Sequence, residues 1–293
     1  MRTAIYVAYY CFSISARKYF SLAQEQMKNL TYCESWPESW KYSYPYDCLE
    51  IYGQRASLGY AYAYRQRVKH TIDFIQTVAK PGAKVLDIAA AQGNFSLRLA
   101  ELGYEVTWND LREDLIDYVK LKHEKGIIHY LPGNILSLNT NQKFDVVLLA
   151  EVIEHVAHPD QLLKKVAEFV KLGGHIVMTT PNGEYFRNRL PRFSDCSNPE
   201  IFESVQFKPN SDGHIFLLHK DEIYQIARAA NLTVKEITFF TNSLTNGHIK
   251  TWLLLKFLPR NFVDWLESLT QQLPLRIRKR ISNGTAVLIE CKG

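Results

Sequence analysis

Long apolar runs are missing from this chain of 293 residues, and so is a pronounced excess of either charge. No window offers the roughly 18 apolar residues that a membrane-spanning helix needs, so we expect no segment to cross a bilayer. The apolar stretch at residues 1–12 is short, contains three tyrosines and is followed by Arg17 and Lys18. We interpret it as part of the folded protein rather than as a signal peptide. The formal net charge of +5 permits an acidic partner without requiring one.

Cysteine is scarce, and its spacing forms no motif. The five cysteines are scattered and lack the short paired spacings of zinc sites and redox-active thiols: Cys11, Cys33, Cys48, Cys196 and Cys291. Structural disulfides belong to oxidising compartments, so this usage predicts a reduced, cytoplasmic setting. Internal repeats and low-complexity tracts are absent from the sequence as well.

The glycine-rich turn of dinucleotide enzymes is replaced here by a turn of other tiny residues. An apolar strand at 84–89 carries Asp87 near its end and leads into Ala89, Ala91 and Gly93. Tiny side chains are needed where backbone approaches a ligand closely, and the helix that follows points its amide end at that ligand. A second strand at 105–109 leads to Asp110, which is placed to accept hydrogen bonds from a ribose diol. This unit predicts a site for a nucleoside-containing cofactor.

The charge of the turn indicates which cofactor it suits. A pyrophosphate site favours G-x-G-x-x-G, but Ala89 and Ala91 hold the first two glycine positions and Asp87 would repel a pyrophosphate. A carboxylate there suits a cofactor with a cationic amino acid end. The segment resembles motif I of the class I S-adenosylmethionine (SAM) dependent methyltransferases, acid-x-G-x-G-x-G, of whose three glycines only Gly93 is kept.

That resemblance implies further cofactor contacts. Asp110 would bind the ribose, Leu111 would pack on the adenine, and Ala150 would lie beneath the methionine part of SAM. At Asn134 and Ile135 the family often has an acid followed by an apolar residue. The amide oxygen of Asn134 still offers an acceptor to the adenine amino group.

Strands and helices alternate from residue 84 onward, which predicts an α/β fold with a Rossmann-like, doubly wound sheet of seven strands. We expect strands at 84–89, 105–109, 127–131, 144–150, 174–180, 233–240 and 286–291, and helices at 61–79, 94–102, 112–124, 159–171 and 220–230. Gly103 and the pair at 173–174 are expected to end helices. The resemblance implies that the last strand is antiparallel to its neighbours.

Three segments fall outside this alternation: an N-terminal cap at 1–60, rich in aromatics, and insertions at 183–215 and 241–284 within the cofactor domain, 61–293. We expect Pro37 and Pro45 to break the cap. Its aromatics either wall a substrate cavity or pack the cap on the core. The insertions lie where such folds bind ligands, and should shape substrate choice. The second one contains an amphipathic stretch from Trp252 to Trp265 and a basic run at 276–280. This pattern is typical of peripheral membrane contact, and equally of a helix that covers its own core.

A cluster of ionisable residues follows the fourth strand. Glu151, Glu154 and His155 are spaced i, i+3 and i+4, so a helical turn would place them on one face. Two carboxylates and an imidazole repel each other or stay partly protonated unless a cation neutralises them. Oxygen ligands with imidazole and without thiolate suit Mg²⁺ or Mn²⁺. Farther along, His214 offers another imidazole.

This Glu-x-x-Glu-His run resembles the ubiquinone-biosynthesis O-methyltransferases and the small-RNA 3′-terminal 2′-O-methyltransferases, over roughly residues 60–240. The resemblance implies a divalent metal, held by Glu151, Glu154, His155 and His214, that grips neighbouring substrate oxygens. Many class I methyltransferases carry a Glu-His pair here without metal. In those, Glu151 would orient a loop and His155 would serve as an acid/base or a structural cap.

We therefore expect O-methylation of a small-molecule acceptor, such as a natural product, a phenol or a carboxylate. The acceptor proton is removed by His155 or His214, or is released because a bound cation lowers the pKa of the hydroxyl. N- or C-methylation is the alternative within the class, and a non-catalytic SAM-binding or membrane-surface scaffold is the alternative outside it. A nicotinamide-linked dehydrogenase would need the missing glycines. The shortness of the basic run argues against a nucleic-acid substrate, and nothing in the sequence specifies an oligomeric state.

Overall fold

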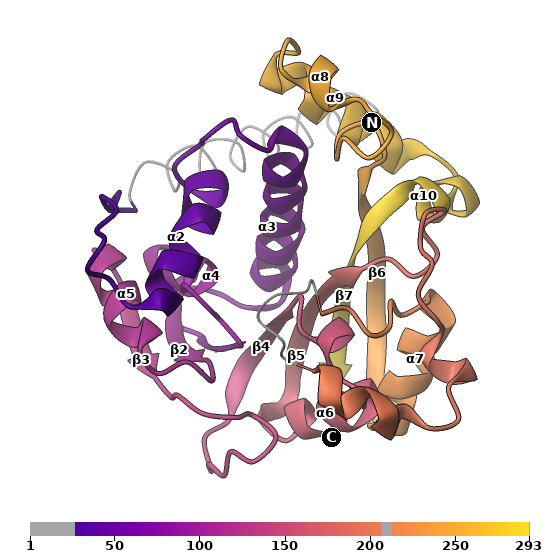
Figure 1. The fold of residues 1–293 in the computed structure, drawn as a ribbon. Helices are drawn as coiled ribbons and strands as arrows, with labels where there is room; N and C mark the ends of the chain where they lie inside the picture. Colours follow the sequence, from indigo (N-terminus) through magenta and orange to yellow (C-terminus); the bar gives the residue numbers. More distant parts are fainter. Residues whose placement is uncertain (1–26, 207–212, 293) are drawn as a thin grey trace, which may run out of the picture.

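A computed structural model describes residues 27–206 and 213–292, whose centre is a seven-stranded sheet (Figure 1). The strand order is β3-β2-β1-β4-β5-β7-β6. The strands are β1 (Lys84–Ile88), β2 (Glu105–Asn109), β3 (Ile127–Tyr130), β4 (Phe144–Ala150), β5 (Val170–Pro181), β6 (Leu232–Asn242) and β7 (Ser282–Cys291). β7 is antiparallel to both of its neighbours, β5 and β6, and the other pairs are parallel. The predicted Rossmann-like sheet with a reversed last strand is confirmed.

Helices cover both faces of the sheet. They are α2 (Glu38–Glu50), α3 (Leu58–Val78), α4 (Asn94–Glu101), α5 (Leu115–Lys122), α6 (Pro159–Ala167), α7 (Lys220–Ala229), α8 (Trp252–Leu255), α9 (Arg260–Gln272) and α10 (Leu275–Ile281). Short 3-10 helices are η1 (Ile153–His155), η2 (Phe193–Asp195) and η3 (Pro199–Val205). None of the helices in the described ranges is long and apolar enough to cross a membrane.

The core consists of two apolar layers, one on each face of the sheet. Successive side chains of a strand point to opposite faces, so Leu86 and Ile88 of β1 pack with α6 and α7, whereas Val85 packs with α3 and α4. Asp87 lies on the α4 side of the strand, where it bonds Ser96. The alternation that builds the core thus directs this carboxylate toward the start of α4.

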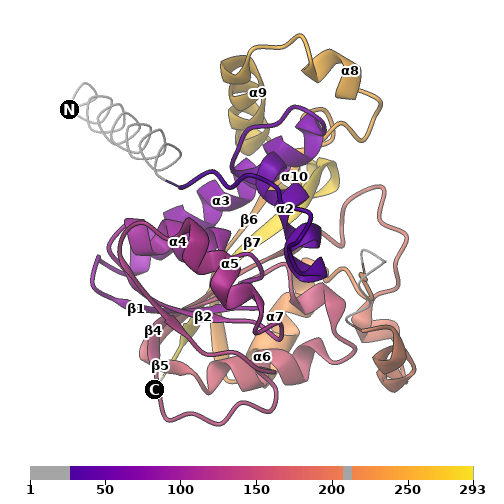
Figure 2. The same cartoon turned by 60° about the vertical axis from the view of Figure 1, so that its left-hand side comes forward.

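The strand order also fixes where a ligand binds. The chain leaves β1 toward β2 on one side, and β4 pairs with β1 on the other. A doubly wound sheet binds its ligands in the crevice at this reversal, outside the carboxyl ends of the strands. Figures 1 and 2 both place α8 and α9 beyond the carboxyl end of β6, at one end of the molecule, and α6 at the opposite end.

Two helices differ from their predicted bounds for local reasons. α5 begins at Leu115 rather than at 112, because Asp110 accepts the Arg112 backbone N–H at 2.9 Å and holds a turn there. α6 ends at Ala167, and the chain is already in β5 at Val170, ahead of the glycines expected to end the helix. The Phe144 backbone N–H donates to the Phe169 carbonyl at 2.9 Å, so β5 begins to pair with β4 before the two glycines are reached.

Residues 38–50 form one helix, so the prediction that Pro45 breaks this segment is wrong. The helix buries four polar or small residues, including Asp47 and Glu50, whose partners are described below. Trp36, just before the helix, and Trp40, in its first turn, pack on Tyr118 of α5, with ring centroids 5.8 and 5.4 Å from that of Tyr118. These two aromatics therefore pack the cap on the core. Its first 26 residues lie outside the described ranges, as does Cys11; the other four cysteines are free thiols.

Candidate active site

The turn after β1 holds two alanines in a conformation that favours glycine. Ala89 has φ 53° and Ala91 has φ 50°, in the left-handed region that is strained for residues with a Cβ. The backbone between them is fixed by hydrogen bonds from Ala90 N–H to the Asn109 carbonyl, 2.8 Å, and from Trp108 Nε1 to the Ala91 carbonyl, 3.0 Å. Strain held by its surroundings in this way is typical of ligand-binding turns.

Gly93 is required at its position for two reasons. Its φ is +76°, and a Cβ built on it would lie 2.8 Å from Cγ2 of Val119. The residue immediately precedes α4 and accepts the Leu97 N–H at 2.8 Å. Gly93, the glycine kept from the motif, thus allows both the left-handed backbone of the turn and the close packing of this turn against α5.

The strain at Ala91 gives a stability prediction. We expect Ala91→Gly to raise the free energy of unfolding by up to about 1 kcal/mol, because removing about 1–2 kcal/mol of left-handed strain exceeds the backbone entropy that glycine loses on folding. That gain corresponds to a rise in Tm of about 2–4 °C. Ala90→Gly is the matched control: this neighbour has no positive φ, so its variant should be less stable than the parent. Thermal unfolding measures both variants, and an equal loss of stability in the two would contradict the claim that the Ala91 backbone is strained.

Asp87 is almost fully enclosed. Its side chain is 2% exposed, and its Oδ2 accepts a hydrogen bond from Ser96 Oγ at 2.6 Å. Burial raises the pKa of Asp87 to about 7, the Ser96 bond opposes that rise and Asp110 adds to it. A contact between this carboxyl group and the ammonium of a cofactor stays a prediction.

Asp110 already holds the turn together. Its Oδ2 accepts the Ala91 N–H at 2.8 Å, and its Oδ1 accepts from Arg112 Nε at 3.0 Å. Leu111 beside it is 52% exposed, which leaves its side chain open for packing against a flat ring. The ribose and adenine assignments for these two residues stay predictions.

The remaining predicted cofactor residues border the same edge. Asn134 is exposed, and its Oδ1 accepts the Leu136 N–H at 3.0 Å, whereas Ile135 is 8% exposed and packs in the core. Ala150 ends β4, and pairing of Ile88 with Leu149 places it next to the turn. Their cofactor contacts are likewise untested.

A buried polar network ties α2 to this turn, and sequence reasoning missed it. Lys122 Nζ lies 2.8 Å from Oδ2 of Asp47 and 2.9 Å from Oδ1 of Asn94, the first residue of α4. Asn94 Nδ2 in turn donates to Glu50 Oε2 at 2.8 Å, and Gln92 Nε2 donates to the same oxygen at 3.3 Å. The cap therefore positions the end of the turn and the start of α4. The sequence signal was two acids, Asp47 and Glu50, spaced i and i+3 in a segment rich in aromatics.

A second cluster forms after β4. Glu154, His155 and His214 each offer one ligand atom, and these atoms lie within 4.8 Å of one another. The imidazole rings have centroids 4.9 Å apart. The Ile215 N–H donates to the Glu154 carbonyl at 2.7 Å, which holds the later segment against η1. The structure thus brings together three of the four residues predicted as ligands.

Glu154 is the buried member of this cluster. Its side chain is fully buried, and Thr180 Oγ1 donates to its Oε2 at 3.0 Å. Its Oε1 has no hydrogen-bond partner among the described residues and lies 3.8 Å from His155 Nε2. Burial, and then the charge of Glu151, raise the pKa of Glu154 well above its usual range. An orphaned carboxylate oxygen beside two imidazoles is a donor set that fits a divalent cation.

Glu151, the fourth predicted ligand, makes an ion pair instead. Its Oε2 lies 2.9 Å from an Arg67 nitrogen on α3. It follows the last residue of β4 and has φ 55°, so it does not continue into a helical turn with Glu154 and His155, whose 3-10 helix begins at Ile153. The pair fastens the end of β4 to α3, which fits the orienting role considered for Glu151.

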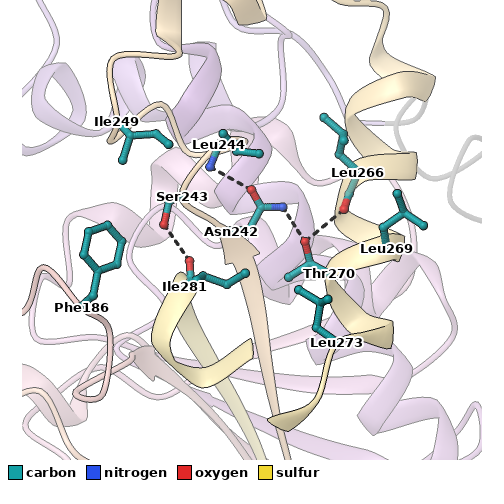
Figure 3. Close-up of a pocket in the computed structure, with 10 residues that line it drawn as sticks. All are labelled: Phe186, Asn242, Ser243, Leu244, Ile249, Leu266, Leu269, Thr270, Leu273 and Ile281. Atoms are coloured by element: carbon teal, nitrogen blue, oxygen red, sulfur yellow. Dashed lines mark hydrogen bonds between the residues drawn. The ribbon is translucent and has the colours of Figure 1, made fainter. Parts of the chain in front are cut away.

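A separate cavity of about 440 Å³ opens past the ends of β5 and β6 (Figure 3). Leu266 and Leu269 of α9, with Leu273 directly after the helix, form one wall. The polar atoms of Asn242 are occupied by Thr270 Oγ1 at 2.8 Å and the Leu244 N–H at 2.9 Å. None of the predicted site residues lines it. The cavity is therefore an apolar space separate from the cofactor turn, since β4, β5 and β7 lie between β1 and β6.

Sequence comparisons with known proteins identify methyltransferases. A model described as a methyltransferase domain matches residues 60–237. A ubiquinone biosynthesis O-methyltransferase of Coxiella burnetii is 30% identical over 166 residues, which cover 56% of this chain and 69% of that protein. The protein of the same name from Proteus mirabilis is 30% identical over 136 residues, 41% of this chain and 56% of that protein. These alignments thus span between about half and two thirds of each relative.

Solved structures share the fold at low sequence identity. A SAM-dependent methyltransferase from Mesorhizobium loti has a TM-score of 0.52 at 14% identity, covering 78% of this chain and 98% of that one. The [4+2]-cyclase SpnF has a TM-score of 0.50 at 13% identity, covering 77% of this chain and 80% of that one. Because one fold serves different chemistries, these neighbours support the architecture alone.

Proposed function

Since this chain belongs to the class I SAM-dependent methyltransferases, we propose that it transfers the methyl group of SAM to an oxygen atom of a small-molecule acceptor. The observation that carries the proposal is the cluster of Glu154, His155 and His214 after β4. The names of its ubiquinone-biosynthesis relatives support an oxygen acceptor. A natural product, a phenol or a carboxylate would suit the site.

For methyl transfer, the protein mainly has to position the acceptor and SAM and to remove a proton from the acceptor. In an in-line displacement the bond between the methyl carbon and the sulfonium breaks while the new carbon–oxygen bond forms, so acceptor and methyl must be held collinear and dry. An acceptor hydroxyl loses its proton as it attacks, and His155 or His214 would take that proton as general base. Glu154 would orient the two imidazoles, and Glu151 would keep the end of β4 fixed to α3 through Arg67.

The same three residues fit a divalent cation such as Mg²⁺ or Mn²⁺. Glu154, His155 and His214 would hold it. When bound, the cation supplies Lewis acidity that lowers the pKa of an acceptor hydroxyl. Without it, the histidines act as bases beside Glu154, whose carboxyl pKa burial raises well above its usual range.

N- or C-methylation is the alternative within the family, and a non-catalytic SAM-binding protein is the alternative outside it. Transfer of a tritiated methyl group from SAM to matched phenols, catechols, carboxylic acids and amines tests the proposal. Label recovered as a methyl ether or ester supports it, and label only on nitrogen or carbon overturns it. Activity lost with EDTA and restored by Mg²⁺ would assign the cation.

The raised pKa of Asp87 gives a pH prediction for cofactor binding. Below pH 7 the group is protonated, and only its carboxylate attracts an ammonium, so affinity for SAM should increase from pH 5.5 to 7 by up to about tenfold per unit. We expect Asp87→Asn to bind SAM more weakly and without this dependence. Calorimetric titration at several pH values makes the measurement. An affinity of the parent that is constant across this range would contradict the contact.

A further inference from the structure

The burial pattern of α9 is inverted. A helix that covers its own core buries its apolar stripe, but α9 buries Glu267 and Thr270 together with Val263. Phe262 and Trp265, on the other side, are 42% and 50% exposed. Glu267 stays inside because it accepts hydrogen bonds from the Asn242 N–H, at 2.8 Å, and from Thr245 Oγ1. The buried side of α9 is thus partly polar, and its exposed aromatics do not contribute to the core of the protein.

The neighbouring helix α8 extends this surface. Leu255 is buried with Val263 against Tyr62 of α3, which seats both helices on the body of the protein. The residues around it are exposed: Trp252 by 51%, Leu253 by 53%, Leu254 by 56% and Phe257 by 83%. We call the six exposed residues Trp252, Leu253, Leu254, Phe257, Phe262 and Trp265 the apolar surface. Clustered exposure of this kind marks an interaction site rather than scattered surface hydrophobics.

The charge of the same segment is strongly positive. Residues 244–281 contain seven lysines and arginines against two acids, a net charge of +5, which equals the formal net charge of the whole chain. Both acids are engaged, Asp264 by Arg65 at 2.9 Å and Glu267 as described above. Lys250, Arg276 and Arg280 form no ion pair with any residue that the structure describes. Apolar aromatics flanked by free cations are complementary to an anionic lipid surface.

We propose that α8, α9 and α10 dock this protein on the surface of an anionic membrane. Aromatic side chains enter the headgroup region, where Trp is favoured, and the basic residues pair with anionic headgroups. A second copy of the chain suits the surface less well, because it would bring the same +5 charge against its own.

The position of the docking helices relates this surface to the active site. α8 and α9 lie beyond the carboxyl end of β6 (Figures 1 and 2). Because β6 and β1 run in the same direction, the turn after β1 leaves the same edge of the sheet. Leu269 of α9 and Leu273 directly after it, which line the cavity of about 440 Å³, are 39% and 37% exposed. Docking would therefore place the mouth of an apolar cavity against lipid.

The test is sedimentation of the full chain with vesicles. We expect binding to phosphatidylcholine vesicles that contain about 30 mol% phosphatidylserine at about 0.1 M salt, and weak binding to phosphatidylcholine alone or at high salt. Phe257→Ser should reduce the partition coefficient at least about tenfold. The double variant Arg276→Ser, Arg280→Ser should reduce it about thirtyfold. Brominated acyl chains should quench Trp252 and Trp265.

Matched controls lie at the opposite edge of the sheet. Leu172, 79% exposed at the start of β5, is the control for Phe257, and Leu172→Ser should bind like the parent. Lys80 and Lys292, before β1 and after β7, are the charge control. Binding that does not depend on phosphatidylserine, or equal losses in variants and controls, would overturn the proposal. So would a stable dimer by light scattering that Phe257→Ser dissociates, with no binding to vesicles.

Discussion

Replacing Lys122 with methionine is expected to lower the free energy of unfolding by about 3–5 kcal/mol, because it leaves the carboxylate of Asp47 buried without a counter-charge. Both side chains of the pair are 0% exposed. Burial lowers the pKa of Lys122, and Asp47 opposes that shift. Tyr118 donates to the same Asp47 oxygen at 2.8 Å, but a neutral hydroxyl does not replace the lost ammonium. The loss would also remove one of the two hydrogen bonds that hold the Asn94 side chain at the start of α4; the bond to Glu50 would remain.

Chemical denaturation measures this effect, and the chain offers two comparisons. Lys120→Met removes an exposed pair with Asp117 from the same helix, and should cost no more than about 1 kcal/mol. Adding Asp47→Asn to Lys122→Met should recover part of the loss, since the unpaired charge is then gone. A Lys122→Met protein as stable as Lys120→Met would show that the buried pair does not hold the cap to the turn.

Removing both imidazoles, by His155→Ala with His214→Ala, is expected to lower kcat by about 10²–10⁴-fold, the usual contribution of a positioned general base. Glu154→Gln should produce a comparable loss, because glutamine keeps the Thr180 hydrogen bond but holds neither a cation nor the imidazoles in the same way. In both cases SAM affinity should stay close to that of the parent, since the cluster lies after β4 and the cofactor turn after β1.

The matched control for this cluster is His129 with Glu105, another histidine and carboxylate, 3.2 Å apart on β3 and β2. His129→Ala should leave kcat within about twofold of the parent. Glu151→Ala is expected to reduce turnover as well, through the loss of the Arg67 pair rather than of a ligand. Turnover unchanged in the Glu151→Ala, Glu154→Ala double variant would overturn the carboxylate and histidine account.

The strands and the cofactor turn were predictable because their signals are local. An apolar run that ends at an acid and opens into alanines and a glycine specifies a strand and a tight turn within about ten residues, and β1 and β2 end as predicted, to within a residue. The Glu-x-x-Glu-His spacing pointed to Glu154 and His155, and the fold brings the later His214 beside them. That spacing did not reveal that Glu151 points away from Glu154 and His155. Its left-handed backbone occurs where the chain leaves β4, and residue spacing alone does not predict this conformation.

The features that sequence reasoning missed depend on contacts between distant segments. Asp47 and Lys122 are separated by 75 residues, and Glu151 pairs with an arginine on α3. Neither pairing has a spacing rule. The stretch from Trp252 to Trp265 was correctly seen as amphipathic, but periodicity alone does not say which stripe faces inward. Only the fold shows that Glu267 is inside and Trp265 outside.

Calorimetric titration of the ligand-free chain with SAM and with S-adenosylhomocysteine tests the central claim most directly, because every role assigned to the turn after β1 requires this cofactor. The account predicts saturable binding of both compounds at one site, none of NAD, and an affinity reduced at least about tenfold by Asp110→Ala, which removes the proposed ribose acceptor. Heat from neither SAM nor S-adenosylhomocysteine in folded, ligand-free protein would contradict it.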